Sequence, residues 1–122
     1  MDDGDVHEKR FVVVGADSDT VTLVINSEIG PFIQARPKLL KCQVQIAAES
    51  HPFMDHDSHI DCSRLRTYTT TEVVRQLVAQ PHWTLGSISD TVRNEIAAAM
   101  KASVVIEPAA LSKWLPGLEN PT

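Results

Sequence analysis

Two short runs of β-branched residues near the start of the chain constrain its fold more than any other feature. The runs at 11–14 and 21–25 are each long enough for one strand, and the six residues between them are Gly, Ala, Asp, Ser, Asp and Thr. Strand-length runs joined by turn-forming residues predict a β-hairpin. Because both runs are almost continuously apolar, we expect this hairpin to be central in its sheet rather than at an edge.

Two stretches with a two-residue period predict further strands. Between residues 42 and 46, amide side chains alternate with apolar ones, which places Cys42, Val44 and Ile46 on one face of a half-exposed strand. Later in the chain, Ile60, Cys62 and Leu65 are expected to point inward, and Asp61, Arg64 and Arg66 outward. We interpret both cysteines as buried structural thiols, because a free thiol in an apolar stretch behaves as a small hydrophobe.

The last third of the chain predicts helices. Thr69 precedes Glu72 by three residues, the spacing of a capping box, and Pro81 is expected to end the helix that follows. Ser89 or Asp90 is expected to begin a second helix. Its buried face consists of residues spaced four apart, namely Val92, Ile96 and Met100.

After the second helix, residues 104–106 are compatible with a short strand, and Pro108 suits the first turn of a final helix. The expected fold class is therefore α+β, mainly β: a small SH3-like barrel or roll with two or three C-terminal helices. A chain of 122 residues supports one core. We expect one domain over 9–115, a frayed N-terminus over 1–8 and a tail over 116–122.

Charge and hydropathy narrow the function classes. No apolar run approaches the roughly 20 residues that span a bilayer, and the acidic N-terminus is not typical of a secretory signal. We therefore expect a cytoplasmic protein without a membrane partner. The net charge is −5, and the eleven Lys and Arg residues are spread along the chain. This balance argues against tight non-specific binding to nucleic acid, although it does not exclude a local basic groove.

The segment between the hairpin and the first alternating stretch, residues 26–37, reads as a long loop. It contains one glycine and two prolines, but also Ile29, Phe32 and Ile33. Exposing these three side chains to water costs free energy. The loop is therefore expected either to fold back on the sheet or to present an apolar patch to a partner.

Residues 51–62 contain an unusual density of groups that can ligate metals or transfer protons. Seven such residues fall within twelve positions: His51, Asp55, His56, Asp57, His59, Asp61 and Cys62. Their spacing matches neither a His-Glu-x-x-His helix nor paired Cys-x-x-Cys knuckles, so we expect no metal and no other cofactor. Three interpretations stay open: a structural loop stiffened by Pro52, an active site that uses a histidine as general acid or base, and a metal site.

Three stretches of the sequence resemble the PemK/MazF-like toxin family, which shares its plan with CcdB. The first is Arg10 at the head of the hairpin, whose second strand ends near Ser27. The second is Leu85-Gly86-Ser87-Ile88-Ser89 with the helix that follows. The third and most distinctive is the segment at 49–60, which is similar to the His-Pro-Phe-x-x-His-x-Ser segment of a divergent branch of the family. The resemblance covers about residues 9–103.

This resemblance implies a CcdB/MazF-like barrel and a toxin of a type II toxin–antitoxin system. Members of the main family cut single-stranded RNA without a metal ion, and they are typically homodimers held by an antitoxin peptide. By this resemblance Arg10 would stabilise the phosphate and Ser27 would orient it. If the 51–60 segment is catalytic, His56 and Asp57 are the candidates for proton transfer. We assign Arg64, Arg66 and His59 to substrate binding.

The residues also support a second hypothesis, a non-catalytic protein–protein interaction module that keeps the toxin-like barrel. Phe11 follows Arg10 where the ribonucleases have proline, and the hairpin turn is acidic at Asp17 and Asp19. A loop that grips RNA would be expected to be basic. The apolar loop at 26–37 would then be a face for a second copy, an antitoxin or another protein partner.

Overall fold

The predicted hairpin is present in the structure, a computed structural model that describes residues 9–119. Its strands are β1 (Arg10–Ala16) and β2 (Asp19–Asn26), and in the turn between them the Asp17 carboxylate accepts a hydrogen bond from the Asp19 amide at 2.9 Å. The pairing shifts by one residue between Val13 and Gly15, which marks a β-bulge. β2 is central, but β1 lies at one end of the sheet, so the expectation of a central hairpin was wrong for β1.

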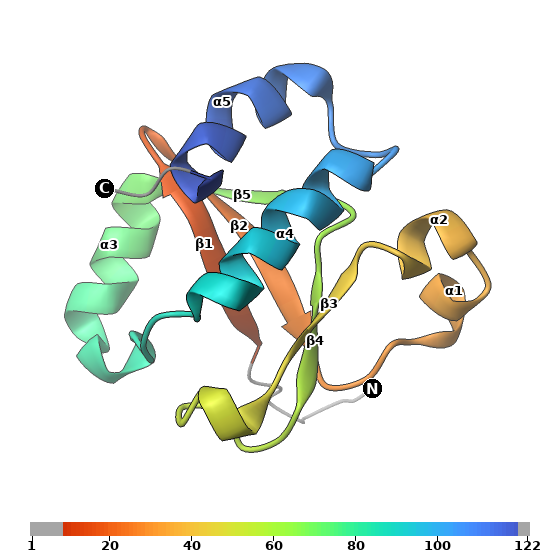
Figure 1. Cartoon of the computed structure of the whole chain (residues 1–122). Coiled ribbons are helices and arrows are strands. Elements are labelled where there is room, and N and C mark those ends of the chain that lie inside the picture. The colour runs from red at the N-terminus through yellow and green to blue at the C-terminus, as the bar shows by residue number, and fades with distance from the viewer. Residues whose placement is uncertain (1–8, 120–122) are drawn as a thin grey trace.

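Five antiparallel strands form one open sheet (Figure 1). Its main path runs β1–β2–β4–β3, with β3 spanning Gln43–Ile46 and β4 spanning Ser58–Asp61. β5 (Arg66–Thr69) pairs with the first half of β2, and β4 pairs with its last two residues. The α+β class is confirmed. Within the described residues β1 and β3 do not meet, so the sheet is not closed into a barrel.

One face of the sheet carries the core, and α4 (Asp90–Ala102) lies across it (Figure 1). The predicted apolar face of this helix is confirmed, because Val92, Ile96 and Met100 are all buried. Ser89 caps the helix: its hydroxyl accepts the Val92 amide at 3.2 Å. We call this core-facing side of the sheet the inner face and the opposite side the outer face.

The alternation predicted for β3 and β4 is present. Cys42, Ile46 and Ile60 are fully buried on the inner face. Asp61 lies on the outer face, as predicted, but it is buried there, where its Oδ1 accepts hydrogen bonds from the Gln43 side chain at 3.0 Å and from the Ser63 amide and hydroxyl. A buried carboxylate needs such donors.

Both cysteines are free and buried, as predicted for structural thiols. The backbone amide of Cys62 donates to the Cys42 carbonyl at 3.0 Å, so the two residues extend the β3–β4 ladder by one pair. Burial raises the pKa of both thiols. Because the thiolate is the reactive form, these side chains serve packing rather than chemistry.

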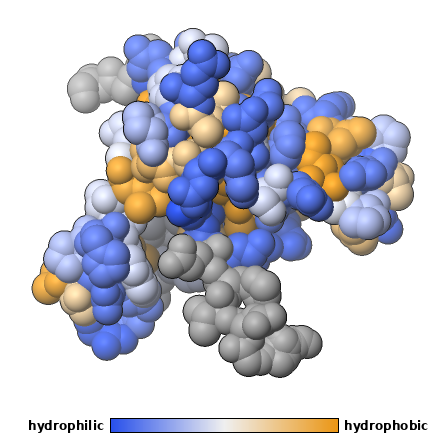
Figure 2. All heavy atoms as spheres, turned by 90° about the horizontal axis from the view of Figure 1, so that it is seen from below, coloured by the Kyte–Doolittle hydropathy of each residue, from blue (hydrophilic) through white to orange (hydrophobic). Residues whose placement is uncertain are grey.

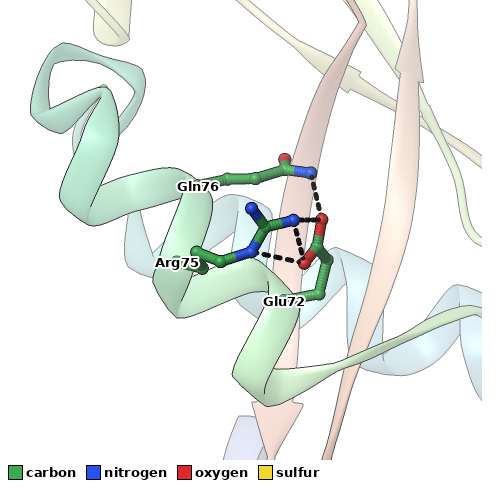
Figure 3. A network of polar contacts seen from close by, with 3 residues as sticks. All are labelled: Glu72, Arg75 and Gln76. Atoms are coloured by element: carbon green, nitrogen blue, oxygen red, sulfur yellow. Dashed lines mark hydrogen bonds and ion pairs between the residues drawn. The ribbon is translucent and has the colours of Figure 1, made fainter.

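The predicted capping box is wrong. α3 (Thr70–Ala79) begins after Thr69, whose side chain makes no capping bond, and the helix ends before Pro81 as expected. Glu72 instead binds the Arg75 guanidinium through both carboxylate oxygens and accepts a bond from Gln76 (Figure 3). The hydrogen bond from Arg75 is the main cause that lowers the pKa of Glu72. A bidentate arginine is a stronger partner for a carboxylate than a neutral backbone amide.

The C-terminal end of the fold differs from the expectation in two ways. Residues 104–106 form no strand, and α5 (Pro108–Glu119) continues beyond the expected domain end at 115. The predicted frayed end at 1–8 and the last three residues of the predicted tail lie outside the described residues. None of the described helices has the length and apolar character needed to cross a membrane.

The segment at 26–37 is not a plain loop. It contains α1 (Pro31–Gln34) and is followed directly by α2 (Pro37–Leu40), and no residue of either helix is buried. The two helices pack on one another and project from the body of the protein beyond β3 (Figure 1). Of the two outcomes predicted for this segment, the structure shows the second, an exposed apolar patch. We call residues 29–41 the arm.

Gly15 is needed where β1 meets α5. A Cβ atom at Gly15 would lie 2.6 Å from Cζ3 of Trp114, a ring that packs against the core. We expect Gly15→Ala to lower the free energy of unfolding by about 1–3 kcal/mol, because the rigid ring must move. Urea denaturation followed by tryptophan fluorescence measures the loss. Gly30→Ala is the control: no atom lies within 4 Å of its added Cβ, and an equal loss there would contradict the explanation.

Candidate functional site

Arg10 lies at the start of β1, where the resemblance places a phosphate-stabilising cation. It is paired with Ile25 of β2, and it lies on the same inner face of β1 as the core residue Val12. Its guanidinium is 3.5 Å from the carboxylate of Asp55, which belongs to the 51–57 loop. Its side chain is only 27% exposed, whereas that of Asp55 is 82% exposed. The candidate catalytic cation therefore has a solvent-exposed carboxylate of the same chain beside it.

Ser27, the second candidate from the resemblance, follows the last residue of β2 and is exposed. Because Arg10 is paired with Ile25, Ser27 comes two residues after that pair, at the same end of the sheet. The predicted neighbourhood of Arg10 and Ser27 is thus present at the level of the backbone. In this arrangement the Arg10 guanidinium forms an ion pair with the carboxylate of Asp55.

His56 and Asp57 have structural partners. The His56 Nδ1 atom is 3.1 Å from the hydroxyl of Ser58, which is itself buried. The Asp57 carboxylate accepts a hydrogen bond from the Ala48 amide at 2.9 Å, at the first turn of the short 3-10 helix η1 (Ala48–Ser50). An acidic side chain satisfying a free amide at a helix start is a stabilising contact. Both residues are explained by the shape of the loop.

His51 is the most constrained residue of the segment, and it is fully buried. Its Nδ1 lies 3.0 Å from the Ala47 carbonyl, and its Nε2 accepts the backbone amide of Ser89 at 3.0 Å. A ring that donates from Nδ1 and accepts at Nε2 is a neutral imidazole. His51 therefore connects the loop to Ser89, the residue that caps α4, and both of its nitrogens are used within the fold.

Phe53 completes this connection. Its ring meets that of His51 edge to face, with centroids 5.7 Å apart and planes at 75°. On its other side it touches Gly86, where an added Cβ would lie 2.8 Å from the Phe53 ring. The His-Pro-Phe motif and the Leu-Gly-Ser-Ile-Ser motif, which carried two parts of the family resemblance, therefore contact one another. Both serve as packing elements here.

His59 lies on the other side of the sheet from Arg10. It is paired with Asn26 of β2 and Gln45 of β3, and it alternates with the buried inner-face residues Ser58 and Ile60. Residue alternation along a strand places it on the outer face. The alternation predicted from the sequence, with Ile60 and Cys62 inward and Asp61 outward, implies the same outer face for His59.

The two arginines assigned to substrate binding lie away from Arg10. Arg66 is paired with Thr22, towards the opposite end of β2 from Asn26. Arg64 is exposed and lines a cleft of about 450 Å³ beside the link between α4 and α5, together with Glu107. The structure thus separates the predicted site residues into three places, and this cleft is not lined by Arg10, Ser27, His56 or Asp57.

The metal hypothesis finds no support in the geometry of the segment. Among the described residues, no three His, Cys, Asp or Glu side chains are grouped so that they could hold one ion. The reason is local: His51 points to Ser89, Asp57 to Ala48, and Asp61 to Gln43. The density of ligands in the sequence is spread over both faces of the sheet.

The arm is the feature that most resembles a binding site. Its exposed apolar side chains include Phe32, which is 63% exposed, and Leu40, which is 40% exposed. Figure 2 shows apolar residues gathered on this lobe, at the right of the view. The Arg36 guanidinium lies 3.5 Å from the centroid of the Phe32 ring and donates to the Phe32 carbonyl at 2.8 Å. The sequence indicated the apolar residues of this segment but not their helical arrangement.

Comparison with known proteins identifies no relative: no family model, no curated protein and no solved structure matches this chain.

The connection made by His51 can be measured. We expect His51→Phe, which keeps a ring of similar size, to lower the free energy of unfolding by about 2–4 kcal/mol, because the Ser89 amide and the Ala47 carbonyl lose their partner. The same substitution at half-exposed His59 should cost much less. Urea denaturation of the two variants tests this, and equal losses would contradict the structural role of His51.

Proposed function

We propose that this protein is a non-catalytic protein–protein interaction module and that its arm is the surface that docks the partner. The observation that carries the proposal is the arm itself: eight residues in two helices, none of them buried, with large apolar side chains in water. Full burial of one such side chain is worth about 1.5–3 kcal/mol. A partner that covers Phe32 and Leu40 would gain that energy.

The shape of the arm is fixed before any partner arrives. Each helix has proline at its first position, where the fixed backbone angle favours a helix start. The Gln34 side chain donates to the Ile29 carbonyl at 2.6 Å, and Cys42 at the base of the arm donates its amide to the Leu39 carbonyl at 3.0 Å. A preorganised surface loses less conformational entropy on binding.

Charge indicates the kind of partner. From Ile29 to Ala48 the sequence contains three cations, Arg36, Lys38 and Lys41, and no Asp or Glu, although the whole chain has a net charge of −5. The arm is therefore the locally basic part of an acidic protein. A protein surface with apolar residues and an acidic rim matches it in both respects.

The toxin-like ribonuclease is the less favoured proposal. Stabilising a developing phosphate charge requires an available cation, and Arg10 is paired with Asp55. His56 and Asp57 bond within their own loop, and His59 is on the other face. The interaction-module proposal keeps a kinship with PemK/MazF-like toxins and a CcdB-like barrel ancestry for this open sheet. It also keeps a cytoplasmic location. An antitoxin-like protein is one partner that would fit it.

A photo-crosslinking amino acid at position 32 tests the docking surface. In cells that naturally make the protein, we expect irradiation to give one main covalent adduct with another protein, because Phe32 would be covered by the partner. The same amino acid at position 78 is the control, since Val78 on α3 is apolar and 74% exposed. Mass spectrometry identifies the adduct.

Charge reversal in the arm sharpens this test. Lys38→Glu combined with Lys41→Glu should remove the position-32 adduct while leaving the fold intact, because both side chains are exposed. The proposal is contradicted by an absence of adducts at position 32, or by the same adducts at 32 and 78. It is also contradicted by an adduct that contains two copies of this chain alone.

A separate experiment addresses the ribonuclease. Purified protein in excess over a long single-stranded RNA should leave the RNA intact, and Asp55→Ala, which frees Arg10, should create no cuts. Gel electrophoresis of the RNA is the readout. Discrete cuts by the unmodified protein that disappear in Arg10→Ala would establish the enzyme and overturn the non-catalytic proposal.

A further inference from the structure

The first eight residues of the chain carry a charge opposite to that of the arm. Their acidic side chains are Asp2, Asp3, Asp5 and Glu8, and the segment contains no Lys or Arg. Four of the sixteen acidic residues of the chain are therefore gathered here, whereas the arm has three cations and no acidic residue. Opposite charges of this kind attract one another over roughly 8–10 Å at physiological ionic strength.

This segment joins the sheet beside the base of the arm. Lys9, the first described residue, donates from its Nζ atom to the side chain of Asn26 at 3.3 Å, and Asn26 is the last residue of β2. The arm begins three residues later, at Ile29. Because three residues span at most about 10–11 Å, the arm begins close to the point where residues 1–8 join the sheet.

The segment is also long enough to cross the arm. Eight extended residues span up to about 26–29 Å. α1 and α2 have four residues each, and a helix of four residues is about 6 Å long. Figure 1 shows the two helices side by side in one small lobe. Residues 1–8 can therefore reach both helices of the arm without any change in the sheet.

We propose that residues 1–8 bind the arm of the same chain and cover it. In this arrangement Asp2 and Asp3 face the ammonium groups of Lys38 and Lys41, which are both exposed. The acidic segment then occupies the surface that the acidic rim of a partner would use. It competes with the partner for the arm, and this role rests on the proposed function of the arm.

Attachment to the same chain makes a weak contact sufficient. A single exposed ion pair contributes little, but a segment tethered a few residues from its site has an effective concentration on the order of millimolar. Val6 adds an apolar contact with the ring of Phe32, which is 63% exposed. A cover that is bound half of the time raises the apparent dissociation constant of the partner about twofold, so a partner can still displace it.

A nitroxide spin label at position 4 tests the contact in the purified full chain. Gly4→Cys provides the attachment point, because both native cysteines are buried. We expect the label to weaken the NMR amide signal of Leu40 in the arm and to leave that of Lys113 unchanged. Lys113 is the control because this cation is paired with Asp17, which follows the far end of β1.

Exchange of charges separates binding from mere proximity. Lys38→Glu combined with Lys41→Glu should restore the Leu40 signal in the labelled chain, because the segment and the arm then repel one another. Addition of Asp2→Lys and Asp3→Lys should weaken the signal again. A Leu40 signal that the label leaves unchanged would overturn the proposal. So would equal weakening before and after the first exchange, or a second exchange without effect.

The competition with a partner has its own readout. Replacement of Asp2, Asp3 and Asp5 by asparagine should raise the yield of the position-32 crosslink about twofold in cells, because the arm is then uncovered. An unchanged yield would overturn the competition. If neither the unmodified segment nor this variant gives an adduct, the proposed docking function is contradicted instead. The spin-label result in the purified protein involves no partner and decides the contact by itself.

Discussion

The hydrogen-bond ladder of β2 is the interaction on which the rest of the structure depends. β1 lies along one side of this strand, while β5 and β4 share the other side, one at each half. Six of its eight residues are buried, and Leu23 is fully buried. Because β4 and β5 pair with different halves of the same side of β2, the two ends of β2 have different neighbours. Arg10 and the 51–57 loop lie at one end, and Arg66 and the hairpin turn lie towards the other.

This arrangement explains how much the sequence could predict. Strand identity follows from local pattern, so the hairpin, the buried set Cys42, Val44 and Ile46, and the apolar face of α4 were all found. What β4 does is not local. Its pairing with β2 sets how far along the sheet His59 lies from Arg10, and no feature of residues 51–61 encodes that pairing without its partner strand.

Two of the differences from the sequence-based predictions have a common physical cause, which is competition between partners for one polar group. Thr69 and Glu72 have the spacing of a capping box, but Arg75 is three residues after Glu72 on the same helix and takes the carboxylate. Asp61 was expected in water, but Gln43 and Ser63 supply it with three donors. A spacing rule identifies one possible partner for a side chain, and the structure shows which partner the side chain binds.

Competition for hydrogen-bond partners also affects the histidines of residues 51–59, because a nitrogen that is bonded within the fold cannot transfer a proton to a substrate. A catalytic histidine needs a nitrogen that faces substrate, but His51 uses both nitrogens to join the loop to the cap of α4. His56 is exposed and uses its Nδ1 atom in a contact with the Ser58 hydroxyl. Asp55 similarly occupies the guanidinium of Arg10. His51, Asp57 and Arg10 thus have partners within the chain, whereas the arm exposes large apolar side chains. Exposed apolar side chains of this kind are covered when another polypeptide binds, and this contrast supports the proposed docking surface.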